Sequence, residues 1–222
     1  MISKSMVSNY EKMKDSMAGK FLQYDQEEII QKFLLEHDSK YIYIQFVGRR
    51  YRINRLTGAI TWSKDHFQTE EKAGYNEAMT IYDVLCYSKK NCHLANEWVN
   101  INSLTTVQGG TLKKENDFFQ SLGKHDNWKT KVLAQACEAL HGKDLKKSDV
   151  AYEFDLFPFL SLILRYWEAD EDFPATMQIW TDKNILDYMH YETLMFAVTH
   201  IIERIKDEYE LIYQNFNFTE LR

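Results

Sequence analysis

The chain has 222 residues, of which 45% are hydrophobic and 14% aromatic, and its 27 Lys and Arg against 33 Asp and Glu give a net charge of −6. This composition excludes intrinsically disordered, collagen-like and low-complexity proteins. Proteins that bind the nucleic-acid backbone usually carry a basic domain or stripe, so the acidic balance predicts no nucleic-acid partner.

The first forty residues have the apolar spacing of two helices. One covers 8–20, and the other follows Asp25, a good N-cap residue, with an apolar stripe from Ile29 to Leu34. Both patterns are short, which predicts a helical segment ahead of the main fold.

A three-stranded meander is expected next. The run 41–47 is rich in β-branched and aromatic residues and ends at Gly48, and segments 51–54 and 59–62 continue with a period of two. Tight connections between such short segments predict antiparallel neighbours.

The only basic cluster of the sequence lies in this meander, at Arg49, Arg50, Arg52 and Arg55. Because successive strand residues point to opposite faces, these arginines do not gather on one side. A solvated sheet edge is therefore favoured over a phosphate-binding site.

The middle of the chain predicts more helix than sheet. Helical spacing covers 76–88, and Asp126 can cap a helix that runs to Leu140. Between them we expect an extended segment at 97–104 and a short helix at 115–121.

The last third predicts two or three strands, at 152–157, 160–167 and 176–180, followed by a helix over about 191–213. Apolar residues recur at every third or fourth position of that helix, the most regular amphipathic pattern in the sequence. Strands and helices come in separate runs, which favours an α+β fold. Its sheet is expected to be mostly antiparallel, made of the N-terminal meander and a C-terminal hairpin and packed with several helices.

No linker or internal repeat divides the sequence. We therefore expect one α+β domain over 1–222, in which a helical segment at about 5–38 precedes a core at about 40–213 and a short C-terminal tail. The longest nearly uncharged apolar run, 156–164, is under half of a membrane-spanning helix, and residues 1–6 lack the layout of a signal peptide. No membrane partner is expected.

The cysteines indicate a reducing compartment. Cys86, Cys92 and Cys137 are odd in number and sparse, which predicts reduced thiols and a cytoplasmic location. The C-x₅-C spacing differs from that of a structural zinc site. Cys86 and Cys137 fit the apolar stripes of two helices, so we expect them to be core residues.

No well-specified catalytic motif occurs. The sequence lacks the two common glycine-rich phosphate cradles, the nucleophile elbow of serine hydrolases and the H-E-x-x-H pair. His141, His190 and His200 are the remaining titratable candidates, and none is assigned a role. His200 lies beside the apolar stripe of the last helix, so we expect its side chain to be exposed.

The most unusual segment is Trp167–Pro174, which holds the carboxylates of Glu168, Asp170, Glu171 and Asp172 between aromatic residues. Because carboxylates this close repel one another, their side chains must extend into water, take up protons, or bind a cation or an arginine. If the segment is extended, three of the carboxylates share a face, which suits Mg²⁺, Ca²⁺ or acid–base chemistry. A solvated hairpin loop, an arginine-paired structure and a functional site all stay open, in that order of preference.

Part of the sequence is similar to a known signature. The similar stretches are Phe157-Pro158, Trp167 to Pro174, Trp180-Thr181-Asp182, the strand hairpin 43–51, and the segments 81–87, 96–101 and 108–110. In this order they resemble an uncharacterised bacterial family that is common in anaerobes, domain-of-unknown-function family 3786. The resemblance spans roughly Tyr10 to Ile205 and implies a shared fold unit and a place in anaerobic metabolism, while it assigns no activity or cofactor. It also suggests Trp98 and Gly109-Gly110 as neighbours of the acidic segment.

Three functions from different classes fit these observations. The favoured one is a non-enzymatic accessory or a small-molecule- or cofactor-binding module of anaerobic metabolism. Its ligand-binding residues would be the aromatic walls Trp167 and Phe173 with Trp98, and the polar anchors Glu168 and Asp170. The acidic neighbours Glu171 and Asp172 complete the set.

The alternatives use other features. An enzyme would use the four carboxylates of the acidic segment for acid–base or divalent-metal chemistry, and at least one of them would then be buried or bind a cation. A protein–protein adaptor, or a homo-oligomer, would use the last helix and Phe216 to Phe218. A conservative interpretation is that Trp167 and Phe173 only pack the core and hold the hairpin together. The ligand, any metal and any cofactor stay unidentified.

Overall fold

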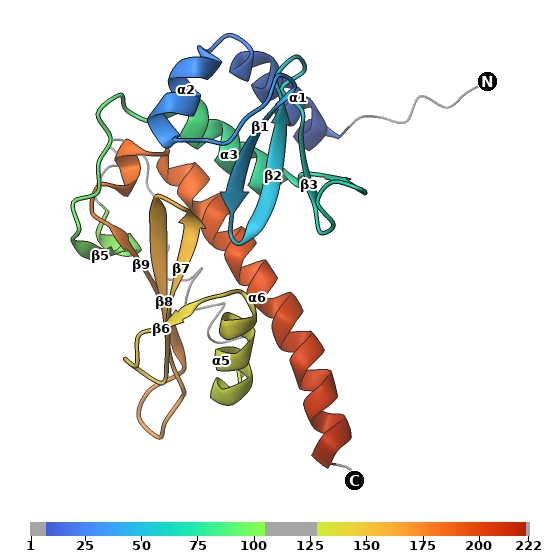
Figure 1. Ribbon diagram of the computed structural model, residues 1–222. Helices are drawn as coiled ribbons and strands as arrows, with labels where there is room; N and C mark the ends of the chain where they lie inside the picture. Colours follow the sequence, from blue (N-terminus) through green and yellow to red (C-terminus); the bar gives the residue numbers. More distant parts are fainter. Residues whose placement is uncertain (1–7, 105–127, 221–222) are drawn as a thin grey trace. The chain divides into compact units, whose positions relative to one another are not determined.

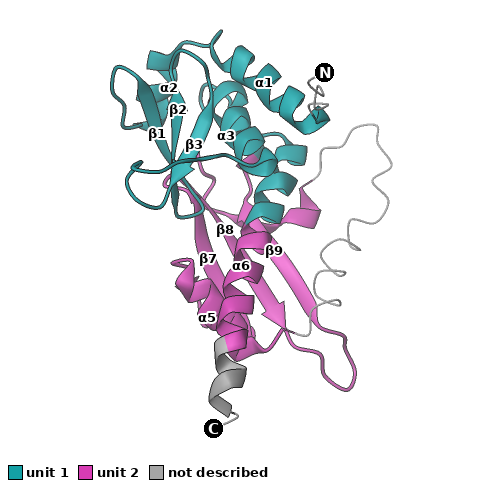
Figure 2. Cartoon of the chain, turned by 90° about the vertical axis from the view of Figure 1, so that its right-hand side faces the viewer, with its two compact units in different colours: residues 1–92, 186–200 teal, residues 93–185, 201–222 magenta. Residues whose placement is uncertain are grey.

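The computed structural model describes residues 8–104 and 128–220, with side chains up to residue 214 (Figure 1). The chain divides into two compact units (Figure 2). Unit 1 consists of residues 1–92 and 186–200, and unit 2 of residues 93–185 and 201–222. Each unit has its own antiparallel sheet, which confirms the predicted α+β class. That the whole chain behaves as one domain stays a prediction.

Unit 1 pairs helices with a four-stranded sheet of order β1-β2-β3-β4. Its elements are α1 (Asn9–Phe21), α2 (Gln26–Phe33), β1 (Tyr41–Phe46), β2 (Arg49–Asn54), β3 (Ile60–Ser63), β4 (Glu71–Lys72), α3 (Tyr75–Tyr87) and the first part of α6 (Tyr191–Glu220). The predicted helices and the meander are thus confirmed, with a two-residue fourth strand added.

One face of the unit 1 sheet is apolar because side chains alternate along each strand. Ile42, Ile44 and Phe46 of β1 and Tyr51 and Ile53 of β2 are all buried. The residues between them are intermediate or exposed, so the opposite face of these two strands carries their polar side chains.

The β1–β2 connection is a two-residue turn, Val47-Gly48, in which both residues have positive φ angles of 47° and 70°. Paired positive φ angles are typical of the hairpin turns that match strand twist. A β-branched residue is uncommon in that conformation. Val47 is only 3% exposed, so burial of its side chain offsets part of the backbone cost.

A close backbone approach at Gly58 joins three parts of unit 1. Gly58 has φ +72°, and a Cβ atom at this position would lie 2.5 Å from the carbonyl oxygen of Ala18 in α1. The buried hydroxyl of Tyr82 in α3 donates to the Gly58 carbonyl at 2.7 Å. Only glycine fits both the backbone conformation and the contact with α1.

Unit 2 is built on a five-stranded sheet of order β5-β9-β8-β7-β6. Its elements are β5 (Trp98–Asn100), η1 (Ile101–Ser103), α5 (Thr130–Ala139), β6 (Lys143–Asp144), β7 (Val150–Phe157), β8 (Leu160–Trp167), β9 (Thr176–Asp182) and the remainder of α6, while η2 (Ile185–Asp187) crosses the boundary between the units in sequence.

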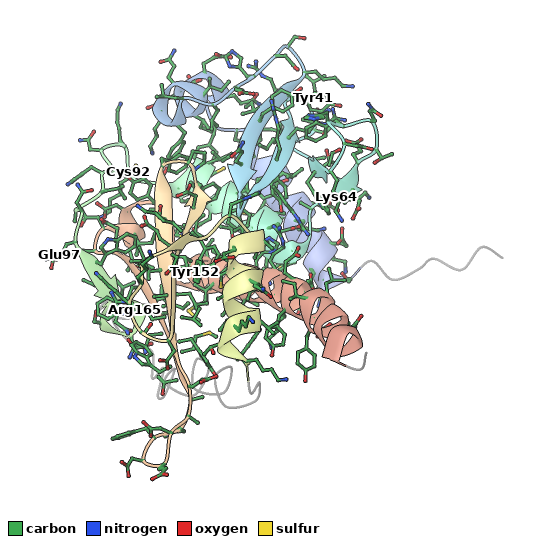
Figure 3. All side chains as sticks on the ribbon, turned by 60° about the horizontal axis from the view of Figure 1, so that its bottom comes forward. Tyr41, Lys64, Cys92, Glu97, Tyr152 and Arg165 are labelled. Carbon is green, nitrogen blue, oxygen red and sulfur yellow. The ribbon has the colours of Figure 1, made fainter. Side chains whose placement is uncertain are left out.

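The two faces of the unit 2 sheet differ in character. On one face, Tyr152 of β7 is buried and its hydroxyl donates to Glu138 of α5 at 3.1 Å. On the other face, the guanidinium of Arg165 in β8 stacks over the ring of Trp180 in β9, 4.5 Å from the ring centroid. Figure 3 labels Tyr152 and Arg165 on their strands.

Some predicted boundaries differ from the structure. The expected extended segment 97–104 forms only a three-residue strand before the 3₁₀ turn η1, because Asn100 caps that turn by accepting from the Asn102 amide. Helix α5 begins at Thr130 with Lys129 as its N-cap residue. The predicted cap Asp126, the predicted helix 115–121 and Gly109-Gly110 lie outside the described residues.

Candidate functional site

The acidic segment forms the connection between β8 and β9, and it is a solvated hairpin loop. Asp170 closes the turn: its Oδ1 accepts from the amides of Asp172 at 2.9 Å and Phe173 at 2.7 Å. The Asp170 amide donates in turn to the Phe173 carbonyl at 3.0 Å. An aspartate that accepts from amides two and three residues ahead is a common turn former. Figure 1 shows this loop extending beyond the paired ends of β8 and β9.

Glu168 connects the base of the loop to neighbouring segments of unit 2. Its amide donates to Asp149 at 2.8 Å, and its Oε1 lies 3.5 Å from the amide of Thr130, the first residue of α5. A carboxylate at a helix N-terminus is stabilised by the orphan amides and the helix dipole. Glu168 and Asp170 therefore have structural partners.

The other loop residues extend into water. Glu171 and Asp172 are exposed, and no ion pair within the described residues involves either of them. Phe173 is 71% exposed, so the interpretation that it packs the core is wrong. None of the four carboxylates is buried, and the burial that acid–base chemistry would need is therefore missing at this loop.

The structure does not bring Trp98 to the acidic loop. Trp167 pairs with Thr176 at the start of β9, whereas Trp98 pairs with Asp182 at the end of the same strand. Six strand residues span about 20 Å. Trp98 and Trp167 therefore stand at opposite ends of β9, and Trp98 is 38% exposed on an edge strand.

Asp182, the last residue of the stretches that resemble the family signature, fixes the backbone before β5 and after β9. Its buried carboxylate accepts from the amides of Ala95 at 2.9 Å, Asn96 at 2.8 Å and Asn184 at 2.8 Å. Asn96 has a positive φ of 56°, a conformation that these hydrogen bonds help to fix. Asp182 therefore has a structural role: it fixes the segment that leads into β5.

A buried polar cluster in unit 1 was not predicted. Its centre is Glu77 of α3, whose Oε1 accepts from the hydroxyl of Tyr51 at 2.7 Å and from the guanidinium of Arg49 at 3.1 Å. Its Oε2 accepts from the amide of Gly74, which caps α3. The side chain of Glu77 is 8% exposed, and His200 of α6 brings its Nε2 to 3.6 Å from Oε1.

The surroundings of this cluster explain how a charge is buried there. The Arg49 guanidinium stacks over Trp62, 4.0 Å from the ring centroid, and the imidazole of His200 stacks on Phe46 with 5.2 Å between centroids. Burial, and then the neighbouring Glu77 carboxylate, raise the pKa of Tyr51 well above its ordinary value, so the phenol stays a donor. The expectation that His200 is exposed is wrong, because the residue is 5% exposed and its imidazole lies against Phe46.

The role of the Glu77 cluster is structural. A carboxylate that already accepts from three donors has little remaining capacity for a cation or a substrate proton. Removing any partner would instead leave a buried charge uncompensated. The available signal in the sequence was the position of Glu77, four residues before Ile81, on the inward face of α3.

The remaining arginines of the basic cluster are neutralised. Arg50 pairs with Glu36 and stacks over Tyr43. Arg52 pairs with Glu70 at 2.6 Å and lies 4.1 Å from the ring centroid of Tyr41, which Figure 3 labels. The expected sheet edge is wrong, because β2 lies between β1 and β3 in the sheet. These two arginines instead form ion pairs with glutamates close to the sheet.

A second carboxylate–imidazole contact in unit 1 is exposed on one side. Asp83 of α3, with a side chain that is 8% exposed, accepts from both the backbone amide and the ring Nδ1 of His190, each at 2.7 Å. The side chain of His190 is 64% exposed. Sequence spacing gave no hint of this pair, since 107 positions separate its members.

The cysteines agree with the core interpretation. Cys86 is 8% exposed and Cys137 fully buried. Burial, and then Asp83, raise the pKa of the Cys86 thiol to about 12, and burial raises that of Cys137 as well. Within residues 8–104 and 128–220, no three His, Cys, Asp or Glu side chains gather in a way that would hold a metal ion.

Comparison with known proteins gives one match. A family model described as a domain of unknown function, DUF3786, matches residues 25–204. No curated protein and no solved structure matches the chain. In the part of the chain that the structure describes, no helix is both long enough and apolar enough to cross a membrane.

Proposed function

The chain belongs to the DUF3786 family, and on this premise we propose that it is a non-enzymatic accessory protein of anaerobic metabolism that acts by binding. Its contact element is the β8–β9 loop, from Glu168 to Phe173, which binds a basic surface of a partner protein. The cytoplasmic location suggested by the three cysteines is part of this proposal; each of them is a free thiol.

The observation that carries the proposal is the exposed phenyl ring of Phe173 at the end of a fixed turn. A large apolar side chain that is 71% exposed offers a partner protein apolar surface to bury. The Asp170 hydrogen bonds already fix the turn, so binding would order little additional backbone. Aromatic anchors of this kind often dominate binding energy.

The charges around the ring define the partner. Glu171 and Asp172 precede Phe173 directly and are exposed, so the loop presents an apolar group with an acidic rim. A partner with an apolar pocket edged by Lys or Arg is complementary to it, and such complementarity raises the association rate. A protruding loop cannot enclose a small molecule as a concave pocket does, which favours a protein partner at this place.

The experiment is site-specific photo-crosslinking in the native host under anaerobic growth. A benzophenone amino acid replaces Phe173 in one variant and Leu56 in a matched control, since Leu56 is 81% exposed in a turn of unit 1. We expect one defined partner to be crosslinked from position 173 and not from position 56. Adding Glu171→Lys and Asp172→Lys should reduce that product at least tenfold.

Two outcomes would overturn the proposal. Equal products from positions 173 and 56 would mean that the loop has no selectivity. A product of twice the chain mass from position 173 would mean that the loop contacts a second copy of the chain and not an accessory partner.

A further inference from the structure

The contact between Asp83 and His190 fixes the chemical state of the imidazole. An ionised carboxylate only accepts hydrogen bonds, so the ring Nδ1, 2.7 Å from Asp83 Oδ1, must carry the proton. In the neutral ring the lone pair then resides on Nε2, on the far side of the imidazole. The second carboxylate oxygen accepts from the His190 amide, which holds the backbone in place as well.

This arrangement is the one found around metal-bound histidines. Such a histidine nearly always donates its other ring nitrogen to a carboxylate or carbonyl, which fixes the ring orientation and makes the ligating nitrogen more basic. Here the carboxylate is buried and the His190 side chain is 64% exposed, while the Nδ1 contact with Asp83 restrains the ring orientation. Helix capping alone would need only the amide hydrogen bond.

A row of two aromatic rings extends from the imidazole. Tyr87 lies edge-to-face with His190 at 5.3 Å between centroids, and Tyr24 lies edge-to-face with Tyr87 at 6.1 Å. Tyr24 and Tyr87 are 36% and 39% exposed, so part of each ring is available to a ligand. The Lys20 ammonium lies 3.5 Å from the Tyr87 hydroxyl and adds a positive charge at the edge of this row.

From this geometry we infer that unit 1 has a binding site for a metal complex, with His190 Nε2 as the axial ligand and Tyr87 and Tyr24 in contact with the organic part. A bare metal ion needs three or four protein ligands, and no such set exists among the described residues. A metal bound at His190 would therefore bring its other ligands in a flat organic molecule, as in metal tetrapyrroles. Lys20 suits an acidic substituent of that molecule.

The site is separate from the proposed docking loop and does not depend on it. Asp83, His190, Tyr87, Tyr24 and Lys20 all belong to unit 1, whereas the loop belongs to unit 2. Failure of one proposal would leave the other standing.

The test titrates the full-length protein with iron(III) protoporphyrin IX and follows its optical spectrum. We expect one equivalent to bind, with the Soret shift of an imidazole-ligated iron. The variant His190→Gln keeps a donor to Asp83 and the backbone amide but has no imidazole, so it should fold normally and lose the shift. Asp83→Asn should weaken binding by about ten- to a hundredfold.

Two controls separate coordination from other effects. His37→Ala removes another exposed histidine of unit 1 and should leave binding unchanged. In His190→Gly, added free imidazole should restore the shift, which a purely structural role of His190 could not produce. The inference is overturned if the wild-type spectrum equals that of free iron protoporphyrin, if His190→Gln binds as the wild type does, or if metal-free protoporphyrin binds equally tightly.

Discussion

The two carboxylate groupings of this protein contrast in every physical respect. The acidic loop of unit 2 carries four carboxylates in five residues, all of them exposed. The unit 1 cluster has a single carboxylate, Glu77, buried and held by Tyr51, Arg49 and the Gly74 amide. The density of charge in the sequence draws attention to the acidic loop. Burial and hydrogen-bond partners, however, make Glu77 the residue whose substitution should lower stability more.

The difference teaches how to interpret an acidic signature. Asp170 explains part of the signature because it closes the β8–β9 turn, and Asp182 explains another part because it accepts hydrogen bonds from three amides near β5. What no structural role explains is Phe173 with Glu171 and Asp172, which is why the proposed contact surface is placed there.

The largest effect is expected for Glu77→Ala. Removing the carboxylate leaves Arg49 and Tyr51 without their buried partner, which should lower the free energy of unfolding by about 3–5 kcal/mol. Glu77→Gln keeps an acceptor for Tyr51 and should cost clearly less. Urea unfolding curves with a common slope would measure both, and equal effects of the two variants would contradict the importance of the charge.

Alkaline pH should weaken unit 1 next. Burial raises the pKa of Cys86 to about 12 and the pKa values of Tyr51 and Tyr82 above their ordinary value of 10. Groups whose pKa is raised on folding contribute stability that is complete below the unfolded pKa, about 9 for the thiol and 10 for the phenols. That stability is lost as the pH rises toward the folded values.

Each of these groups lowers the free energy of unfolding by up to about 1.4 kcal/mol per pH unit in that window. The free energy of unfolding, measured by urea at pH 8, 9.5 and 10.5, should therefore fall by a few kcal/mol in total, with most of the fall above pH 9.5. The double variant Tyr51→Phe, Cys86→Ala should show a shallower fall. A slope unchanged by these substitutions would refute the assignment.

Asp170→Ala should have a smaller effect. The substitution removes two hydrogen bonds that close the β8–β9 turn, and by analogy with the loss of a capping side chain we expect about 1 kcal/mol. Asp170→Asn keeps an acceptor and should recover most of the loss. Thermal unfolding would show both, and a loss that Asn fails to recover would indicate a role for the charge beyond the turn.

The smallest effect is expected for the double variant Glu171→Gln, Asp172→Asn. Both side chains are exposed, so the free energy of unfolding should change by less than about 0.5 kcal/mol. Crosslinking from position 173 should nevertheless decrease if these charges guide a partner. A destabilisation above 1 kcal/mol would show that the charges have a structural role after all.

Periodicity and turn chemistry determined much of the fold from the sequence. The three-residue and four-residue spacing of the last helix, the alternation in the meander and the N-cap at Asp25 each depend on neighbours a few positions away, and the structure has all three. The buried positions of Cys86 and Cys137 followed from the same local logic. Local interactions are visible in a single sequence because 3.6-residue and two-residue periods fix which side chains share a face.

Only the tertiary structure decided the polar sites. Glu77 is separated from Tyr51 by 26 positions, and Asp83 from His190 by 107. His200 was placed at the edge of its helix stripe, but Phe46 and Glu77 from other elements cover it. The six-residue distance between Trp98 and the loop along β9 likewise depends on strand pairing. Burial and partner choice arise from long-range packing, and no local period encodes which distant side chain covers a charge.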